Sequence, residues 1–393
     1  MKAPQPIVLI TNRPEMAAYI ETFNTEQTEY RIELHYSPES PVALPSSGPF
    51  PDLVISEAIA GNDKIRNFRP LDRLFLEGKL RAREFYSEIL KTGRRNNRQY
   101  LLPVSFDLPL LMYSSRIPGK ENELYFLNLS DLRQFASQYN KKNSDRYVQM
   151  GFSPLWYGDF LILVTQLLGT AFTADAEQVI RYNSKNLNLA LEFLREWSDR
   201  ENGGPSKEMQ FKETYLTSPP HRQVSLGYAR YAYSSASSLF TLPESRRIGV
   251  DFRWIGNKGK IQALENILYI GILQKAPNPK GAEAFLRWFF QLNIQKKLLE
   301  ATKHKFLYSF GLFRGFSSLR SINEEEYPQL YPILIGHIPP EEILEFPPPI
   351  PHEWEELKRN ILIPFILDTL QGNQNAGSLE ARLKSWLLTR PAR

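Results

Sequence analysis

PIVLITNRPEMAAYIETFNTEQTEYRIELHY, residues 6–36, decides the fold class of this chain. The compact apolar run at 6–11 predicts a buried strand, after which Asn12 can cap a helix whose apolar residues recur at helical spacing. Residues 30–36 alternate apolar and polar side chains and predict a second strand, and PDLVIS at 51–56 predicts a third. This order of elements predicts an α/β fold in which helices flank a largely parallel sheet.

Length and composition indicate a globular chain of roughly two to three domains. The chain has 393 residues, of which 42% are hydrophobic and 23% are charged. It contains no cysteine, which excludes disulfides, thiol catalysis and zinc held by cysteine. The net charge is +5, and the only tight basic cluster is KTGRRNNRQY at 91–100. A loop before a strand explains that cluster as well as a phosphate contact does, so we expect no nucleic-acid partner.

No segment of the sequence predicts a membrane span. The longest apolar stretch, 160–172, is too short and too polar to cross a bilayer. No signal peptide is visible, and the chain starts almost directly with a strand, as it would after removal of an export signal. The sequence therefore leaves the compartment open, including an anchoring cysteine cut away upstream of residue 1.

The sequence offers no positive sign of a metal site or of a familiar catalytic motif. Its five histidines are scattered and form no close ligand pair, so we expect no metal. It contains no G-x-S-x-G or G-x-G-x-x-G motif, and GNKGK at 256–260 lacks the spacing of a phosphate-binding loop, so we expect no cofactor. The paired carboxylates of a glycosidase stay open, because such residues converge only in the fold.

Aromatic residues are abundant, with 24 Phe, 19 Tyr and 6 Trp. Most belong in cores, since aromatic side chains dominate core burial. Several stand at expected strand ends and loop mouths beside polar groups, including Trp156-Tyr157 and Tyr231-x-Tyr233. A sugar ring offers an apolar face on which aromatic rings stack, and hydroxyls that carboxylates or Arg bind two at a time. These aromatic residues therefore fit either ordinary packing or a sugar platform.

Six segments carry a family likeness in their sequence and in their order. The most specific is PNPKGAEAFLRWFFQLNIQKKLLEA at 277–301, and the weaker ones are AAYIETFN, PDLVIS, FRPLDRLF, QYLLPVSFDLPLLMYSSRI and LNLSDLRQFA. The likeness extends along nearly the whole chain, from PIVLIT to about Gly372, and the chain resembles the extracytoplasmic solute-binding proteins of ABC importers, in their maltose-binding-like group. The chain departs from that family at RQVSLGYARYA and KFLYSFGLFRGF, which leaves the ligand and its contacts open.

The resemblance implies the type II periplasmic-binding-protein fold, with two α/β lobes joined by crossing strands and a ligand cleft between them. Each lobe would hold a mostly parallel sheet flanked by helices. The expected N-terminal lobe is 1–110 plus 262–309, the expected C-terminal lobe is 113–258 plus 313–393, and the expected hinge crossings lie near 110–113, 258–262 and 309–313.

The function implied by the resemblance is solute capture rather than catalysis. The chain would bind a sugar-like or oligosaccharide-like polar solute in the cleft, close around it by hinge motion, and deliver it to the membrane subunits of an ABC permease. It would act as a monomer in the periplasm or another extracytoplasmic location. Two alternatives remain: a drifted surface lipoprotein of the same fold that binds a peptide or protein, and a glycan-active enzyme.

The expected ligand contacts combine polar residues at strand ends with aromatic rings. Ser56 and Glu57 end the third strand at a carboxyl edge, where open α/β sheets bind ligands. The resemblance implies that Asp107 binds a sugar hydroxyl and that Trp156 and Tyr157 stack on a sugar ring. The full set is Arg13, Ser56, Glu57, Asp107, Trp156, Tyr157, Tyr231, Tyr233 and Phe313.

Each of these residues also has a structural explanation. Trp156 can pack between helices, and alternate residues of one strand, such as Tyr231 and Tyr233, can face the core. The neighbouring acid Asp159 is expected to cap the helix that runs to Phe172 rather than to bind the ligand.

Overall fold

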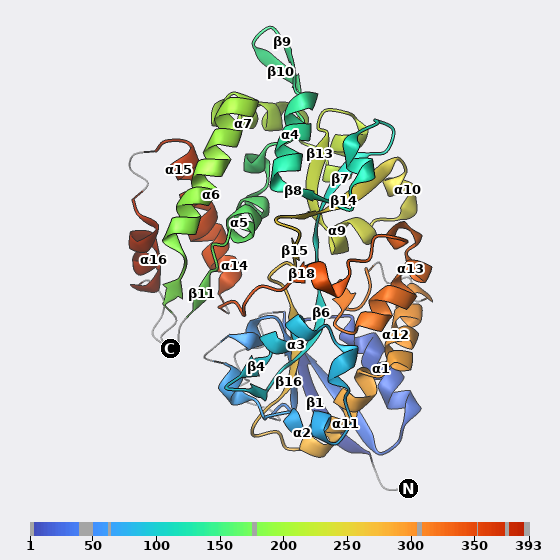
Figure 1. The fold of residues 1–393 in the computed structure, drawn as a ribbon. Coiled ribbons are helices and arrows are strands. Elements are labelled where there is room, and N and C mark those ends of the chain that lie inside the picture. Colours follow the sequence, from blue (N-terminus) through green and yellow to red (C-terminus); the bar gives the residue numbers. More distant parts are fainter. Residues whose placement is uncertain are drawn as a thin grey trace. The chain divides into compact units, whose positions relative to one another are not determined.

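The chain divides into two units, each assembled from two separate stretches of sequence (Figure 1). In the computed structural model, unit 1 comprises Met1–Asp107 and Ala263–His352, and unit 2 comprises Leu108–Gln262 and Glu353–Arg393. The chain therefore passes from one unit to the other three times. The residues that the structure describes are 4–38, 50–61, 64–174, 179–304, 309–351, 353–373 and 377–388.

A six-stranded mixed sheet forms the centre of unit 1. Its strands are, in spatial order, β17 (Phe316–Ser317), β6 (Leu102–Phe106), β16 (Leu268–Ile272), β3 (Leu53–Ser56), β1 (Gln5–Thr11) and β2 (Tyr30–Tyr36). β1 is parallel to both β2 and β3. β16 is antiparallel to β3 and β6, and β17 is antiparallel to β6. Only the β2-β1-β3 side of this sheet is therefore parallel.

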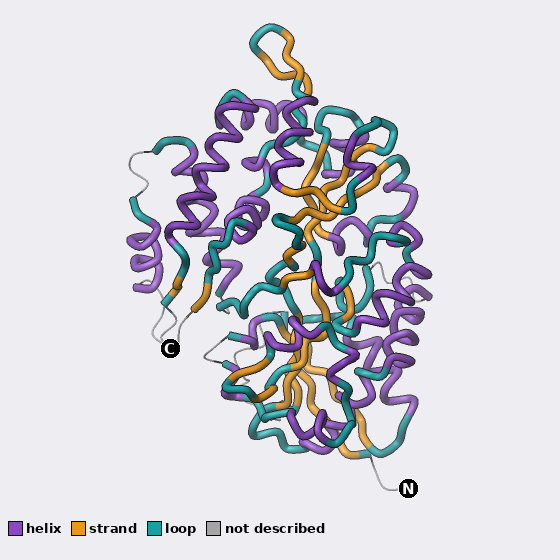
Figure 2. The backbone as a smooth tube through the Cα atoms, in the orientation of Figure 1, coloured by secondary structure: helices purple, strands orange, loops and turns teal. Residues whose placement is uncertain are grey.

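Helices cover this sheet with apolar stripes. Those of unit 1 are α1 (Met16–Glu26), α2 (Asp72–Leu76), α3 (Ser87–Thr92), α11 (Pro279–Phe289), α12 (Leu292–His304) and α13 (Tyr327–Leu330), and its short strands are β4 (Arg94–Arg95), β5 (Arg98–Gln99) and β18 (Leu344–Glu345). On α11, Ala282, Phe285 and Phe289 are buried at helical spacing, and the helix packs on β1 and β16. Phe285 also meets Phe23 of α1 edge-on, with ring centroids 5.3 Å apart. Figure 2 shows these helices running beside the strands.

Unit 2 has a second mixed sheet, of four strands. They are, in spatial order, β13 (Tyr231–Ser235), β7 (Pro109–Ser114), β14 (Val250–Gly256) and β8 (Phe126–Asn128). β7 is antiparallel to both of its neighbours, and β14 is parallel to β8. The short strands of this unit are β9 (Lys141–Asn143), β10 (Arg146–Gln149), β11 (Thr173–Ala174), β12 (Ile180–Arg181) and β15 (Ile261–Gln262).

The apolar helix α5 (Gly158–Leu167), in which residues 160–165 are all buried, lies in the core of unit 2 and contacts two other helices of the unit. The other helices of unit 2 are α4 (Leu129–Tyr139), α6 (Ser184–Glu196), α7 (Pro205–Tyr215), α8 (Pro220–Ser225), α9 (Ala236–Phe240), α10 (Glu244–Arg247), α14 (Trp354–Leu357), α15 (Ile363–Leu370) and α16 (Leu379–Leu388). Because α6 and α15 both contact α5, the C-terminal stretch of the chain completes the core of this unit.

The structure confirms the α/β class and corrects two details of the prediction. The sheets are mixed rather than mostly parallel, because the strands that enter after a crossing, β7 and β16, run antiparallel to their neighbours. The predicted crossing at 309–313 is wrong, because β17 pairs with β6 and residues up to 352 group with unit 1. The divisions after Asp107 and Gln262 lie close to the other two predicted crossings.

A buried carboxyl group lies in the core of unit 2. Glu208, on α7, has no exposed surface and accepts hydrogen bonds from Ser198 Oγ (2.6 Å) and Asn202 Nδ2 (2.5 Å). Burial is the largest influence on this group and raises its pKa above the usual value, against the opposing effect of the hydrogen bonds. Ionisation of Glu208 therefore opposes the folding of unit 2.

We predict that Glu208 makes the stability of unit 2 fall as the pH rises. The folded state holds this proton more tightly than the unfolded state, so the contribution is fully present below the unfolded pKa of 4.5 and is lost as the pH rises through the folded pKa. The Glu208→Gln variant has no ionisable group at this position. Its free energy of unfolding should therefore fall less steeply with rising pH than that of the wild-type protein. Urea unfolding of both proteins from about pH 4 to about pH 8 measures this difference. The same pH dependence of the free energy of unfolding in both proteins would contradict the role given to Glu208.

Candidate functional site

Arg13 and Glu57 meet at the carboxyl edge of the parallel strands in unit 1. β1 and β3 are neighbours, and their register pairs Thr11 with Ile55. The residues that follow the two strands therefore lie at the same edge, where Arg13 Nη2 forms an ion pair with Glu57 Oε1. The two side chains are 20% and 25% exposed, so the pair stays within reach of solvent. Open α/β sheets bind their ligands at this edge.

Among the described residues, three polar atoms in the loop between β1 and α1 have no hydrogen-bond partner. They are Asn12 Oδ1, Arg13 Nε and Glu15 Oε2, and all three are shielded from solvent. The prediction that Asn12 caps α1 is wrong, because Glu15 occupies the N-cap position and makes no capping bond with its side chain. Buried polar atoms in folded proteins are normally paired, so this edge has hydrogen-bonding capacity that water or a bound solute would satisfy.

Sequence reasoning did not single out Asn12 or Glu15 as site residues. Capping accounted for Asn12, and an acid just before a helix is common because it interacts favourably with the helix dipole. The signal that could have revealed them is local: three of the four residues at 12–15 are polar, directly after a strand that ends at the ligand edge of the sheet.

Ser56 and Asp107, both predicted to bind the ligand, are buried in unit 1. Ser56 Oγ accepts a hydrogen bond from the Ala58 N–H (3.2 Å) and closes the turn after β3, which is a structural role. The backbone oxygen of Asp107 accepts a hydrogen bond from the Leu264 N–H (2.9 Å), which ties together the two stretches of unit 1. A ligand contact of the Asp107 carboxyl group stays a prediction.

Trp156 belongs to the core of unit 2, which corrects its predicted role as a stacking platform. Its side chain is 4% exposed, and its ring stacks on Phe211 of α7 with centroids 5.6 Å apart and an interplanar angle of 17°. Its Nε1–H donates to the backbone oxygen of Glu208 (3.1 Å). The short turn at Pro154–Trp156 presents the indole to α7, so one face of the ring is already occupied by protein.

Tyr231 and Phe313 are also core residues. Tyr231 is fully buried and its hydroxyl donates to Glu121 Oε2 (2.9 Å), while Glu121 is ion-paired with Arg230. Burial raises the pKa of Tyr231 to about 12. Phe313 is 3% exposed and lies edge-on to Tyr19, with ring centroids 4.8 Å apart. Both predicted contacts are corrected, because these side chains are engaged within their own units.

Tyr157 and Tyr233 lie beside each other in unit 2, with ring centroids 5.9 Å apart. Tyr157 is half-buried, and its hydroxyl donates to Gln223 Oε1 (2.9 Å). Tyr233 is 8% exposed and also contacts the ring of Phe160. Of the four aromatic residues predicted in this unit, Tyr157 keeps the most accessible ring, and its stacking on a ligand stays a prediction.

Asp159 is in the first turn of α5 and does not cap it. The N-cap position is Tyr157, and the helix ends at Leu167 rather than at Phe172. The carboxylate of Asp159 instead forms an ion pair with Lys358 Nζ (3.0 Å), which links α5 to the C-terminal stretch of unit 2.

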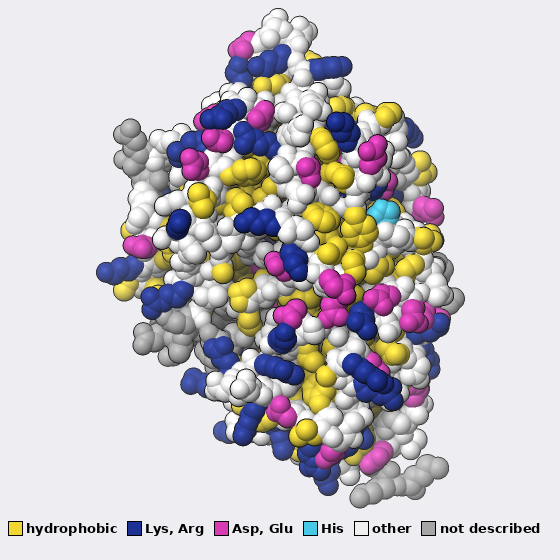
Figure 3. Space-filling model, viewed as in Figure 1, with side chains coloured by type: hydrophobic (Ala, Val, Ile, Leu, Met, Phe, Trp, Pro, Cys, Tyr) yellow, Lys and Arg dark blue, Asp and Glu magenta, His cyan; other side chains and the backbone are white. Residues whose placement is uncertain are grey.

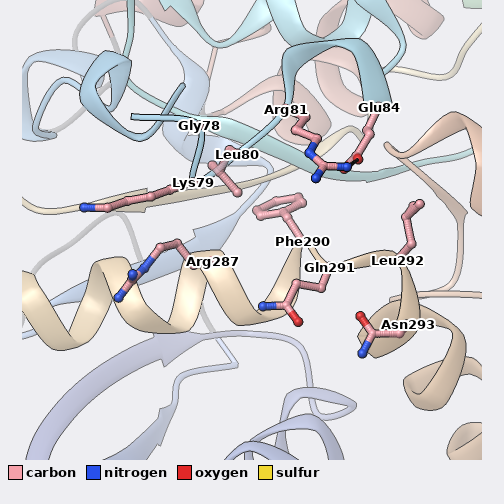
Figure 4. A pocket seen from close by; sticks show the side chains of 10 residues that line it. All are labelled: Gly78, Lys79, Leu80, Arg81, Glu84, Arg287, Phe290, Gln291, Leu292 and Asn293. Carbon is pink, nitrogen blue, oxygen red and sulfur yellow. Dashed lines mark hydrogen bonds and ion pairs between the residues drawn. The ribbon is translucent and has the colours of Figure 1, made fainter. Parts of the chain in front are cut away.

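A surface pocket of about 320 Å³ lies elsewhere in unit 1, between the α2–α3 connection and the junction of α11 with α12. Figure 4 shows Phe290 at its centre, Arg81 beside Glu84, and the side chains of Lys79 and Arg287 extending away from Phe290. Because these cations do not converge and two of the charges pair with each other, the pocket has no clear anion site. None of the predicted ligand residues lines it.

The described residues contain neither a metal-binding cluster nor a membrane-spanning helix. No group of three or more His, Asp or Glu side chains in this part of the chain is arranged to hold a metal ion. None of its helices combines the length and the apolar character needed to cross a bilayer.

Known structures share the fold of this chain, although its sequence matches no known family. No protein-family model matches the sequence, and no curated protein matches it significantly. The structure is similar to that of a cyclo/maltodextrin-binding protein complexed with maltotetraose, at 13% identity and a TM-score of 0.69, over 100% of both chains. It is also similar to a cyclic α-maltosyl-1,6-maltose-binding protein from Arthrobacter globiformis, at 15% identity and a TM-score of 0.63, over 98% of this chain and 97% of that one.

A third similar structure is an ABC substrate-binding protein from Listeria monocytogenes in complex with cycloalternan. It shares 11% identity and a TM-score of 0.62, over 97% of each chain. The chain therefore has the two-lobe fold of type II periplasmic binding proteins, and the likeness seen in the sequence is confirmed at the level of fold. The neighbours named here are binding proteins rather than enzymes.

We predict that Trp156→Ala destabilises unit 2 without a direct effect on ligand contacts. Removing a buried aromatic side chain typically costs about 3–5 kcal/mol, and this substitution also removes the hydrogen bond from the indole to the Glu208 carbonyl. Urea unfolding measures the change, with Leu226→Ala as the control because Leu226 is 59% exposed. An unchanged midpoint for Trp156→Ala, together with weakened solute binding, would restore the platform role.

Proposed function

We propose that the chain is the extracytoplasmic solute-binding component of an ABC importer and that it captures a sugar-like polar solute between its two units. The observation that carries the proposal is the Arg13–Glu57 pair at the carboxyl edge of unit 1, in a fold shared with proteins solved with bound oligosaccharides. Support for a sugar in particular comes from the chemistry of this edge.

The edge offers donors and acceptors close together, as sugar hydroxyls require. The guanidinium group of Arg13 has five N–H donors, and its ion pair with Glu57 engages one of its nitrogens. The unpaired oxygens of Asn12 and Glu15 can accept from hydroxyl groups. A hydroxyl both donates and accepts, so neighbouring hydroxyls of one ring could satisfy both kinds of atom. Tyr157 in unit 2 would supply the aromatic face.

Capture would work through movement of the two units. The chain crosses between them three times, and a solute that contacts both would favour the closed arrangement by its higher affinity for that state. The closed form would then be read by the membrane subunits of the permease, outside the cytoplasm. The protein would act as a monomer, since one chain supplies both units.

We predict that calorimetric titration with oligosaccharides detects binding and that Arg13→Gln weakens it. The panel would start with maltotetraose, cycloalternan and mannobiose, the ligands of similar structures. Loss of a hydrogen bond from a charged donor should raise the dissociation constant about 10- to 100-fold. The matched control is Arg73→Gln, which removes an exposed arginine from another Arg–Glu pair of unit 1.

Two results would count against the proposal. The first is no heat and no shift of melting temperature with any sugar of the panel. The second is a sugar that binds the wild-type protein and Arg13→Gln equally well, which would show that the carboxyl edge is not part of the binding site.

A further inference from the structure

The β4–β5 hairpin of unit 1 is a compact basic element that the proposed solute site does not use. Residues 91–98, KTGRRNNR, contain four cations and no acid. Arg94, Arg95 and Arg98 are all exposed. Figure 3 shows Lys and Arg side chains gathered over the part of unit 1 where Figure 1 labels β4. The hairpin therefore concentrates positive charge at the surface.

The register of the hairpin places like charges against each other. Arg95 pairs directly with Arg98, and like charges opposite each other destabilise an antiparallel pair. Asn96 and Asn97 form the two-residue turn between these arginines. Their φ angles of 48° and 59° are both positive, as in a type I′ hairpin turn. The turn thus places the two arginines directly opposite each other in the hairpin.

The base of the hairpin is firmly held. Gln99 Nε2 donates to the backbone oxygens of Leu90 (2.9 Å) and Leu101 (2.6 Å), and the Gln99 N–H donates to Asp72 Oδ1 (3.1 Å). Arg94 Nε in turn donates to Gln99 Oε1 (2.9 Å). A side chain at Gly93 would place its Cβ 2.1 Å from the Leu101 oxygen, so glycine is required there. The charged tip is therefore presented by a fixed base rather than by a mobile loop.

Arg95 and Arg98 have no counter-charge among the residues that the structure describes, whereas Lys91 of the same segment pairs with Glu88. Neither guanidinium group donates a hydrogen bond to a residue that the structure describes. Their juxtaposition is unfavourable for folding and favourable for binding a surface that carries negative charge.

We propose that the β4–β5 hairpin binds the anionic headgroups of a phospholipid surface. This proposal rests on the proposed function, in which the protein delivers its solute to membrane subunits. A lipid surface fits better than nucleic acid because the Asn96-Asn97 tip carries no aromatic ring on which bases could stack. The hairpin holds the protein near the bilayer by reversible electrostatic attraction, which salt weakens.

The test measures binding of the full chain to phosphatidylcholine vesicles containing about 30% phosphatidylglycerol, by co-sedimentation at low salt and without sugar. Arg95→Gln/Arg98→Gln should weaken partitioning about 25-fold, from roughly fivefold for each basic residue at an anionic surface. The matched control is Lys141→Gln/Arg146→Gln, which removes the same charge from the exposed β9–β10 hairpin of unit 2. That control should bind nearly as well as the wild-type protein.

Several results would overturn the proposal: no binding of the wild-type protein, equal losses in the two double variants, or tighter binding of RNA than of vesicles through the same two arginines. Sugar titration of Arg95→Gln/Arg98→Gln should match that of the wild-type protein. If no sugar binds but the vesicle result holds, the solute proposal fails while the hairpin assignment stands.

Discussion

The sheet of unit 1 is complete only when β16 inserts between β3 and β6. β3 and β6 come from the first stretch of the unit, whereas β16 comes from the second, about 160 residues later than β6 along the chain. Neither stretch buries its apolar strands alone, so the chain must leave unit 1, build most of unit 2 and return. Two of the three crossings between the units, those after Asp107 and Gln262, follow from this one insertion.

The same arrangement gives the candidate site its place. The inserted strand runs antiparallel, but β1 and β3 keep a parallel edge of their own, and Arg13 and Glu57 follow that edge. An ion pair that is about one-quarter exposed contributes little to stability, because solvent screens it. Its value lies in holding two charged groups in a fixed position beside the unpaired atoms of Asn12 and Glu15. Such an edge is better suited to binding than to folding.

Local sequence patterns predicted much of the fold and the location of two residues of the candidate site. Strand ends are local features, so Arg13 and Glu57 could be placed at one edge from the sequence. Core aromatic residues could not be separated from ligand platforms, because their neighbours are distant in sequence: Trp156 stacks on Phe211, and Tyr231 donates to Glu121, 110 residues away. The direction of β16 was missed for a similar reason, since an apolar run does not reveal which way its partners run.

The proposed mechanism requires that solute binding draws the two units together. Small-angle X-ray scattering of the protein with and without a saturating sugar tests it most directly. If a sugar that binds by calorimetry also reduces the radius of gyration, and Arg13→Gln requires more sugar for the same reduction, the claim holds. A sugar that binds tightly and leaves the scattering curve unchanged would contradict it.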